Sequence, residues 1–142
     1  MLLGDAAHST GGTLGQGCNS ALADCVALDE LLAARAEELA AEPTASVVDL
    51  VGERFSALRQ PEGLALWKLL QLPPRGALRF PYLAAQAAAG LFSRLLPSVV
   101  EPPVQNVLSE TTTAYAEIVE RNSGWVAAAL KDAPGTGVAT FE

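Results

Sequence analysis

Apolar residues recur at intervals of three and four along most of this chain, and that spacing is typical of one face of an α-helix. The first such run predicts a helix from about Asn19 to Ala41, which ends before Pro43. Acidic residues such as Asp24 lie mostly off the apolar stripe and are predicted to be solvated. The stripe, which is predicted to face the core, consists of Leu22, Cys25, Leu28, Leu32, Ala36 and Leu39.

Prolines and short polar segments divide the remainder of the chain. Ser46 is the predicted N-cap of a second helix, and Pro61 is predicted to end it and to begin a third, because proline is tolerated in the first turn of a helix. A break is predicted at Asn122, and the residues from Asp132 to Glu142 are predicted to be a loose tail. The predicted helices after the first cover residues 46–60, 61–72, 81–96, 104–122 and 125–131.

The first residues follow a different pattern. Met1 to Leu3 is a short apolar run that stops at Gly4 and Asp5, which is how a buried parallel strand enters a turn. No other run of comparable strand character follows, so this strand end has no predicted partner in the chain. The predicted fold is therefore mainly α-helical with one N-terminal strand end.

Composition excludes some classes of function. Half of the 142 residues are apolar, as in a globular domain. Nine basic residues stand against 16 acidic ones, and the net charge of −7 argues against a nucleic-acid partner. The two cysteines, Cys18 and Cys25, have neither metal-site nor disulfide-framework spacing and are predicted to be small apolar fillers. No metal site is predicted.

Targeting signals are not evident in this sequence. No basic segment followed by a long apolar run is present near Met1, so an intracellular location is favoured over secretion, with the compartment left open. The longest uncharged stretch, residues 80–93, has about 14 residues and is too short to span a bilayer. No transmembrane segment is predicted.

Glycines near the start form a candidate ligand cradle. Gly15 and Gly17 precede a helix, where the backbone can approach a ligand closely and free N–H groups favour negative charge. Asp5 adds a carboxylate that can accept hydroxyl hydrogen bonds. Structural alternatives remain open, because Asp5 can cap a turn, Asn19 can be a helix N-cap, and a lone histidine such as His8 is more often a hydrogen-bonded structural residue than a catalyst.

Three segments carry a resemblance to a known family. They are GDAAH at residues 4–8, GQGCN at 15–19, and DC with LDELL within 24–32. In this order they resemble the second FAD fingerprint of the group A flavoprotein monooxygenases, most closely in the form found in the kynurenine 3-monooxygenase family. RFSALRQP at residues 54–61 extends the similarity more weakly. The resemblance covers most of the chain, but only the first 32 residues are specific.

The resemblance implies an α/β FAD-binding fold of the glutathione-reductase-like Rossmann type. Residues 1–41 would close the FAD-binding domain, 42–131 would be a C-terminal helical region, and 132–142 the tail. Asp5 would contact the ribityl chain or the phosphate side of FAD, and the flavin ring edge would meet Gly15, Gly17, Cys18 and Asn19. The family uses NADPH to reduce the flavin and hydroxylates a small aromatic substrate. No catalytic residue is implied in this segment.

Three departures from the family pattern limit what the resemblance implies. None of the 12 glycines forms the G-x-G-x-x-G turn that binds the ADP half of FAD, so the chain is expected to match only the C-terminal portion of such an enzyme. The family's proline is missing between Ser9 and Leu14. Pro73 and Val104 stand roughly where the family has an asparagine and a tyrosine that hold the kynurenine carboxylate, so kynurenine is not carried over as substrate.

Several hypotheses follow. The first is an FAD-binding segment of an NAD(P)H-dependent aromatic-ring hydroxylase, inactive as an isolated chain, whether as a fragment, a truncated gene model or half of a split protein. The second is a catalytically dead helical module, derived from that fold, that binds a partner through apolar faces. The third is an α-helical domain whose opening turn matches by chance.

Overall fold

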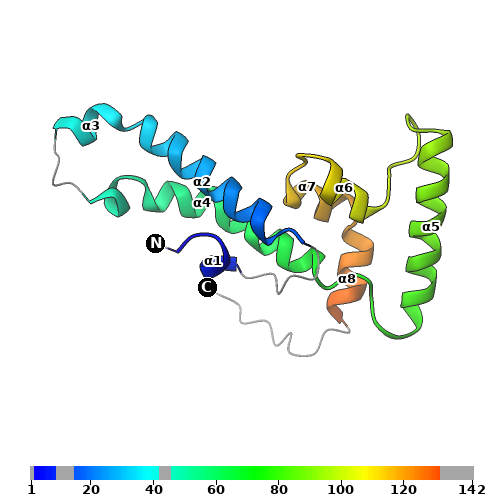
Figure 1. Ribbon diagram of the computed structural model, residues 1–142. Coiled ribbons are helices and arrows are strands. Elements are labelled where there is room, and N and C mark those ends of the chain that lie inside the picture. Colours follow the sequence, from blue (N-terminus) through cyan, green and yellow to red (C-terminus); the bar gives the residue numbers. More distant parts are fainter. Residues whose placement is uncertain (1, 9–14, 42–45, 132–142) are drawn as a thin grey trace. The chain divides into compact units, whose positions relative to one another are not determined.

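The computed structural model describes residues 2–8, 15–41 and 46–131, and all regular structure within these ranges is helical (Figure 1). The elements are α1 (Asp5–His8), α2 (Gly17–Ala33), α3 (Ala36–Ala41), α4 (Val47–Leu69), the 3-10 helix η1 (Gly76–Leu78), α5 (Arg79–Leu95), α6 (Val104–Glu110), α7 (Tyr115–Arg121) and α8 (Ser123–Lys131). The predicted helical class is thus confirmed. Of the helices in these ranges, none has the length and hydropathy that a membrane span requires.

The predicted strand end is not formed in the described part of the chain. Leu2 and Leu3 have no regular secondary structure, and Met1 lies outside the described residues. A strand is stable only when its backbone groups pair with a neighbouring strand, and the described ranges contain none. The predicted Gly4-Asp5 turn is present, and it leads directly into α1.

The chain divides into two compact units, Met1–Leu64 and Ala65–Glu142. In the first unit α2 and the first part of α4 lie side by side (Figure 1), joined by an ion pair between Asp24 and Arg59. Its buried apolar residues are Ala27, Val51 and Phe55. In the second unit the buried apolar residues are Ala65, Leu66, Leu69, Tyr82, Val104, Leu108, Ile118, Val126 and Ala129.

The buried face of α2 differs from the predicted stripe. Ser20, Asp24 and Ala27 are buried, whereas Leu22 is 60% exposed. The predicted solvation of Asp24 is therefore wrong, because a cation from α4 pairs with it. Both cysteines are exposed, so they are not core fillers. The predicted single helix to Ala41 is also divided, since a turn at residues 34–35 separates α2 from α3.

Pro61 lies inside α4 and does not end it. The predicted boundary between residues 60 and 61 is therefore wrong, although the predicted start next to Ser46 is confirmed. Proline removes one backbone hydrogen bond and costs about 3 kcal/mol in a helix interior. Burial on both sides of it, at Phe55 and at Leu66, offsets that loss. Beyond Pro61 the helix buries Leu66 and leaves Trp67 43% exposed.

Aromatic and polar contacts organise the second unit. The rings of Tyr82 and Trp125 meet edge to face, with centroids 5.4 Å apart. The Gln86 side chain accepts the backbone N–H of Val104 at 2.9 Å, which satisfies a donor at the start of α6. Burial raises the pKa of Tyr82 above its ordinary value of 10.0. The predicted helix from Pro81 to Leu96 is confirmed as α5, which begins at Arg79.

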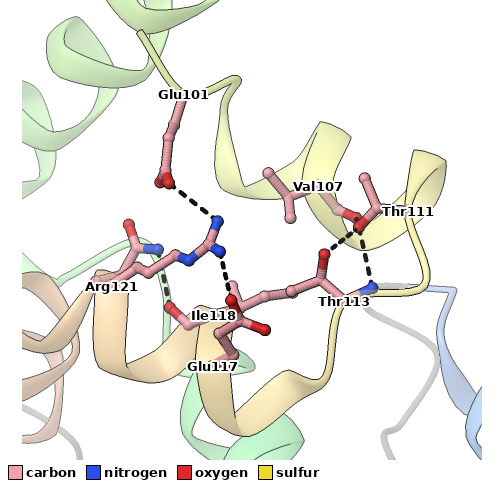
Figure 2. A network of polar contacts seen from close by, with 8 residues as sticks. Glu101, Val107, Thr111, Thr113, Glu117, Ile118 and Arg121 are labelled. Atoms are coloured by element: carbon pink, nitrogen blue, oxygen red, sulfur yellow. Dashed lines mark hydrogen bonds and ion pairs between the residues drawn. The ribbon is translucent and has the colours of Figure 1, made fainter. Parts of the chain in front are cut away.

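The predicted helix from Val104 to Asn122 is two helices, α6 and α7. Thr111 is extended, its hydroxyl donates to the Val107 carbonyl, and it also accepts the Thr113 N–H (Figure 2). Threonine side chains offer the backbone such local alternatives to helical bonds. After α7 a break at Asn122 is confirmed, and α8 begins at Ser123, two residues before the predicted start. The predicted tail, 132–142, lies outside the described residues.

Candidate functional site

The Gly4 turn is fixed directly against α2. Its φ of +55° belongs to the left-handed region, where glycine is favoured. A Cβ at this position would meet the Ala21 Cβ at 3.1 Å. The Gly4 carbonyl accepts the N–H groups of Ala7 and His8 at 2.9 and 3.0 Å, which starts α1. Glycine is therefore required here by both conformation and space.

One buried carboxylate holds this turn. Asp24 on α2 is 1% exposed. Its Oδ2 accepts the backbone N–H of Gly4 at 2.8 Å and lies 2.8 Å from His8 Nε2. Its Oδ1 accepts Arg59 Nε of α4 at 2.6 Å. Three chain segments thus meet at a single side chain.

The charge state of Asp24 follows from two opposing effects. Burial disfavours the carboxylate and raises its pKa, but hydrogen bonds from Arg59, Gly4 and His8 together outweigh burial. The pKa of Asp24 therefore lies below its ordinary value of 3.8. Asp24 is ionised at neutral pH, and Arg59 is its counter-ion.

His8 completes this network. Its Nδ1 lies 3.3 Å from Ser20 Oγ, so a neutral ring that donates from Nε2 to Asp24 accepts the serine proton at Nδ1. A Cβ at Gly63 of α4 would come within 3.4 Å of the His8 ring, which shows that this helix packs closely on the imidazole. His8 is hydrogen-bonded at both ring nitrogens, in agreement with the expectation of a hydrogen-bonded residue.

Ser20 contacts His8, and His8 contacts Asp24, which is the pattern of contacts in a Ser-His-Asp hydrolase triad. The environment of these residues differs from that of such a triad. Ser20 is 1% exposed and thus out of a substrate's reach. The guanidinium of Arg59 already neutralises the carboxylate that would stabilise a protonated histidine. The network joins α1, α2 and α4 through buried polar contacts.

The start of α2 lies next to this buried network. The helix begins at Gly17, with Gln16 at the N-cap position. Asn19 is inside the first turn and donates from Nδ2 to Gln16 Oε1 at 3.1 Å, so the structure does not place it at the N-cap, the alternative left open by the sequence. Gln16 is 4% exposed. Gly15 has a φ of +66°, and no atom of the described residues lies within 4 Å of a Cβ position there.

The residues expected to contact a cofactor form an accessible outer layer. Asp5 stands at the start of α1, and most of the others stand at the start of α2. Of the five, Gly17 is half-buried and the rest are exposed: Asp5, Gly15, Cys18 and Asn19. The loop at residues 9–14, including the predicted glycine pair at Gly11 and Gly12, lies outside the described residues. Among the residues that the structure does describe, no three histidine, cysteine or acidic side chains gather as metal ligands.

A small cavity lies in the second unit. Its volume is about 120 Å³, and Val104 lines it together with Glu101 and Arg121. The Arg121 guanidinium is already engaged by Glu101 at 2.9 Å and by Glu117 (Figure 2). Val104 has no polar side-chain atom to hold a substrate carboxylate.

Two curated proteins match this chain. The kynurenine 3-monooxygenases of Salinispora tropica and Salinispora arenicola are each 35% identical to it over 130 residues, which cover 85% of the chain. This chain is a homologue of the C-terminal part of the kynurenine 3-monooxygenases. It spans 25% of the length of these two relatives. No protein-family profile and no solved structure matches it.

The homology gives the buried network a context. Asp24 and Arg59 fall within two segments that carry the resemblance to the kynurenine 3-monooxygenase family, DC and RFSALRQP. Neither residue stands out in the sequence by itself, because a carboxylate off the apolar stripe normally points to solvent. An arginine 35 residues away is not a local signal. Only their presence in those two segments could have drawn attention to them.

Proposed function

We propose that residues 1–41 form the flavin-side part of an FAD site in an NAD(P)H-dependent aromatic-ring hydroxylase. They would close an FAD-binding domain of the glutathione-reductase-like Rossmann type, and residues 42–131 would form the helical region after it. One observation carries the proposal. The accessible outer layer lies over a buried layer whose polar side chains, Gln16, Ser20 and Asp24, all have partners.

Each residue of the outer layer has a role suited to its chemistry. Asp5 contacts the ribityl chain or phosphate side, because an exposed carboxylate accepts hydroxyl hydrogen bonds. Gly15 and Gly17 permit close approach of the ring, and Cys18 and Asn19 border its edge. The first N–H groups of α2 have no acceptor within the helix, and its N-terminus carries positive partial charge. That end of the helix stabilises the negative charge of a reduced flavin.

The bound FAD supplies the oxygen chemistry of hydroxylation, and the chain supplies binding and orientation. The ADP half of FAD needs a glycine turn that this sequence does not contain, so the proposed site is completed by other residues and the isolated chain is inactive. NADPH is the proposed reductant and a small aromatic molecule the proposed substrate. Kynurenine itself is not proposed, because Pro73 and Val104 cannot grip its carboxylate.

Flavin binding tests the proposal. The chain is purified alone and as a fusion behind the part of the S. tropica enzyme that precedes the matched region. We expect the fusion to retain a flavin that absorbs near about 450 nm, and the chain alone to retain none. Asp5→Ala should weaken FAD binding in the fusion, whereas Asp29→Ala, at an exposed acid of the same region, should not. A folded fusion without flavin would refute the proposal.

A second function is favoured by the surface of α5. Phe80, Leu91 and Leu95 are 79%, 61% and 67% exposed along this helix. Exposed apolar side chains grouped in this way are typical of protein contacts. As a helical interaction module the chain would self-associate or retain a partner, and Leu91→Gln would abolish that. A monomer at all concentrations by sedimentation equilibrium, with no partner retained, would exclude this function.

A further inference from the structure

We infer that Asp24 is a positioning residue, which sets the placement of Asp5 relative to the start of α2. This inference rests on the proposed function, because it concerns the geometry of the proposed flavin site. Asp24 itself is 1% exposed, and its three partners already occupy it. It acts on a ligand only through the residues it holds.

The two parts of the outer layer are anchored on different segments of the chain. Cys18 and Asn19 belong to α2, the same helix that carries Asp24. Asp5 belongs to the turn at Gly4, whose N–H is bound by the Asp24 carboxylate at 2.8 Å. The proposed flavin-hydroxyl contact, Asp5, is thus linked to the helix end that would meet the ring through the Gly4–Asp24 hydrogen bond. A loss of this bond weakens the attachment of Asp5 to α2.

His8 secures the other end of the same short segment. It closes α1 and binds the same carboxylate oxygen at 2.8 Å. The segment from Gly4 to His8 is therefore held at both ends by Asp24, with Asp5 between them. Close contact with Ala21 limits its sideways movement, since even a Cβ at Gly4 would reach the Ala21 Cβ at 3.1 Å.

Arg59 makes this arrangement stable in its charged form. Arg59 Nε donates to Oδ1 of Asp24, which leaves Oδ2 to bind the Gly4 turn. It also lies within 3.5 Å of the Ser20 carbonyl, so it is placed against α2 at two points. A buried carboxylate without a cation would bind a proton and lose an acceptor site. Arg59 thus keeps Asp24 able to accept both Gly4 and His8.

The test uses Asp24→Asn, which keeps the shape and removes the charge. In the full chain, amide hydrogen exchange followed by NMR should show the Gly4 N–H exchanging at least about tenfold faster, because a neutral amide accepts more weakly and has only one acceptor oxygen. Amides in the middle of α2 should change less. Asp29→Asn, an exposed carboxylate on the same helix, should leave Gly4 unchanged.

The role in flavin placement needs the fusion protein. Asp24→Asn should raise the Kd for FAD at least about tenfold, by fluorescence titration under conditions where the protein stays folded. Val51→Ala is the stability control, since Val51 is 1% exposed and lies outside the network. It should lower stability and leave the Kd for FAD within about twofold.

A double substitution separates positioning from general support. If Asp24 acts through Asp5, then Asp24→Asn should have little further effect on FAD binding once Asp5→Asn is present. The inference would be overturned if Asp24→Asn weakened FAD binding as much in the Asp5→Asn variant as in the wild type. It would also be overturned if Asp24→Asn alone left the Kd for FAD unchanged. Unchanged Gly4 exchange would overturn it whatever the flavin result. A folded unmodified fusion that binds no FAD instead refutes the proposed function, and the exchange result then decides whether Asp24 holds the turn.

Discussion

Removal of Arg59 should strongly destabilise the first unit. Arg59→Met keeps the aliphatic part of the side chain and deletes the guanidinium. Arg59 and Asp24 are 13% and 1% exposed, so the carboxylate would remain buried with two of its three donors. Breaking a buried ion pair by deleting one partner costs about 3–5 kcal/mol. That is a large part of a stability that is typically about 5–15 kcal/mol.

Urea denaturation followed by circular dichroism at pH 7 measures this loss. Arg121→Met is the matched control, because Arg121 pairs with Glu101 and Glu117 at side chains that are 43%, 63% and 50% exposed. Exposed pairs contribute less than about 1 kcal/mol. Arg59→Lys retains a cation and should fall between the wild type and Arg59→Met.

A double-mutant cycle decides whether the pair itself is responsible. Asp24→Asn combined with Arg59→Met should cost less than the sum of the two single changes, by about 2 kcal/mol or more, because each single change leaves one buried charge unpaired and the double variant leaves none. A loss below about 1 kcal/mol in Arg59→Met would refute the reasoning, since it would place this pair among exposed ones. Strict additivity in the cycle would refute it as well.

Three further substitutions or conditions give separate predictions. Gly4→Ala should lower the thermal unfolding temperature more than Gly15→Ala. Both glycines have a positive φ, but in the described structure only a Cβ at Gly4 would meet a close neighbour, Ala21. Equal decreases in the unfolding temperature would contradict the contact with Ala21. The pKa of Asp24 is lower in the folded state than its ordinary value of 3.8, so its ionisation stabilises the fold at pH values above 3.8 and this stabilisation is lost as the pH falls. The wild type should therefore lose stability below pH 3.8 more steeply than Asp24→Asn. Urea midpoints of the two proteins that run parallel from about pH 7 to 3 would contradict this. Burial raises the pKa of Tyr82 above 10.0, so its contribution to stability is present below pH 10.0 and is lost as the pH rises through the pKa of the folded state. Ultraviolet titration should show one of the two tyrosines ionising at a higher pH than the other. Two coincident titrations would contradict this.

Local signals account for the parts of the fold that were predicted correctly. Helix starts next to Ser46 and close to Pro81, and a break at Asn122, follow from capping and backbone preferences within a few residues. Pro61 shows the limit of such signals, because burial at residues before and after it keeps α4 continuous. At Thr111 the side chain competes with helical bonding, which the spacing of apolar residues does not reveal.

The candidate site shows a similar division. The exposure of Asp5, Cys18 and Asn19 agrees with their prediction as cofactor contacts, and their role stays a prediction. The burial of Asp24 could not be predicted from periodicity, because it depends on Arg59, which is 35 residues away in sequence. Long-range pairing of this kind reverses the normal preference of a carboxylate for water.

The meeting of three segments at one carboxylate also implies an order of assembly. The Gly4 turn and Arg59 lie 20 and 35 residues from Asp24 in sequence, on opposite sides of it. Burying Asp24 against the turn alone would leave a charge without a counter-ion, which is unfavourable until α4 has packed on α2. We therefore expect the pairing of α2 with α4 to precede the closing of the Gly4 turn. The Gly4 turn is therefore expected to be the last of these three segments to become ordered, and its order would report that α2 and α4 have paired.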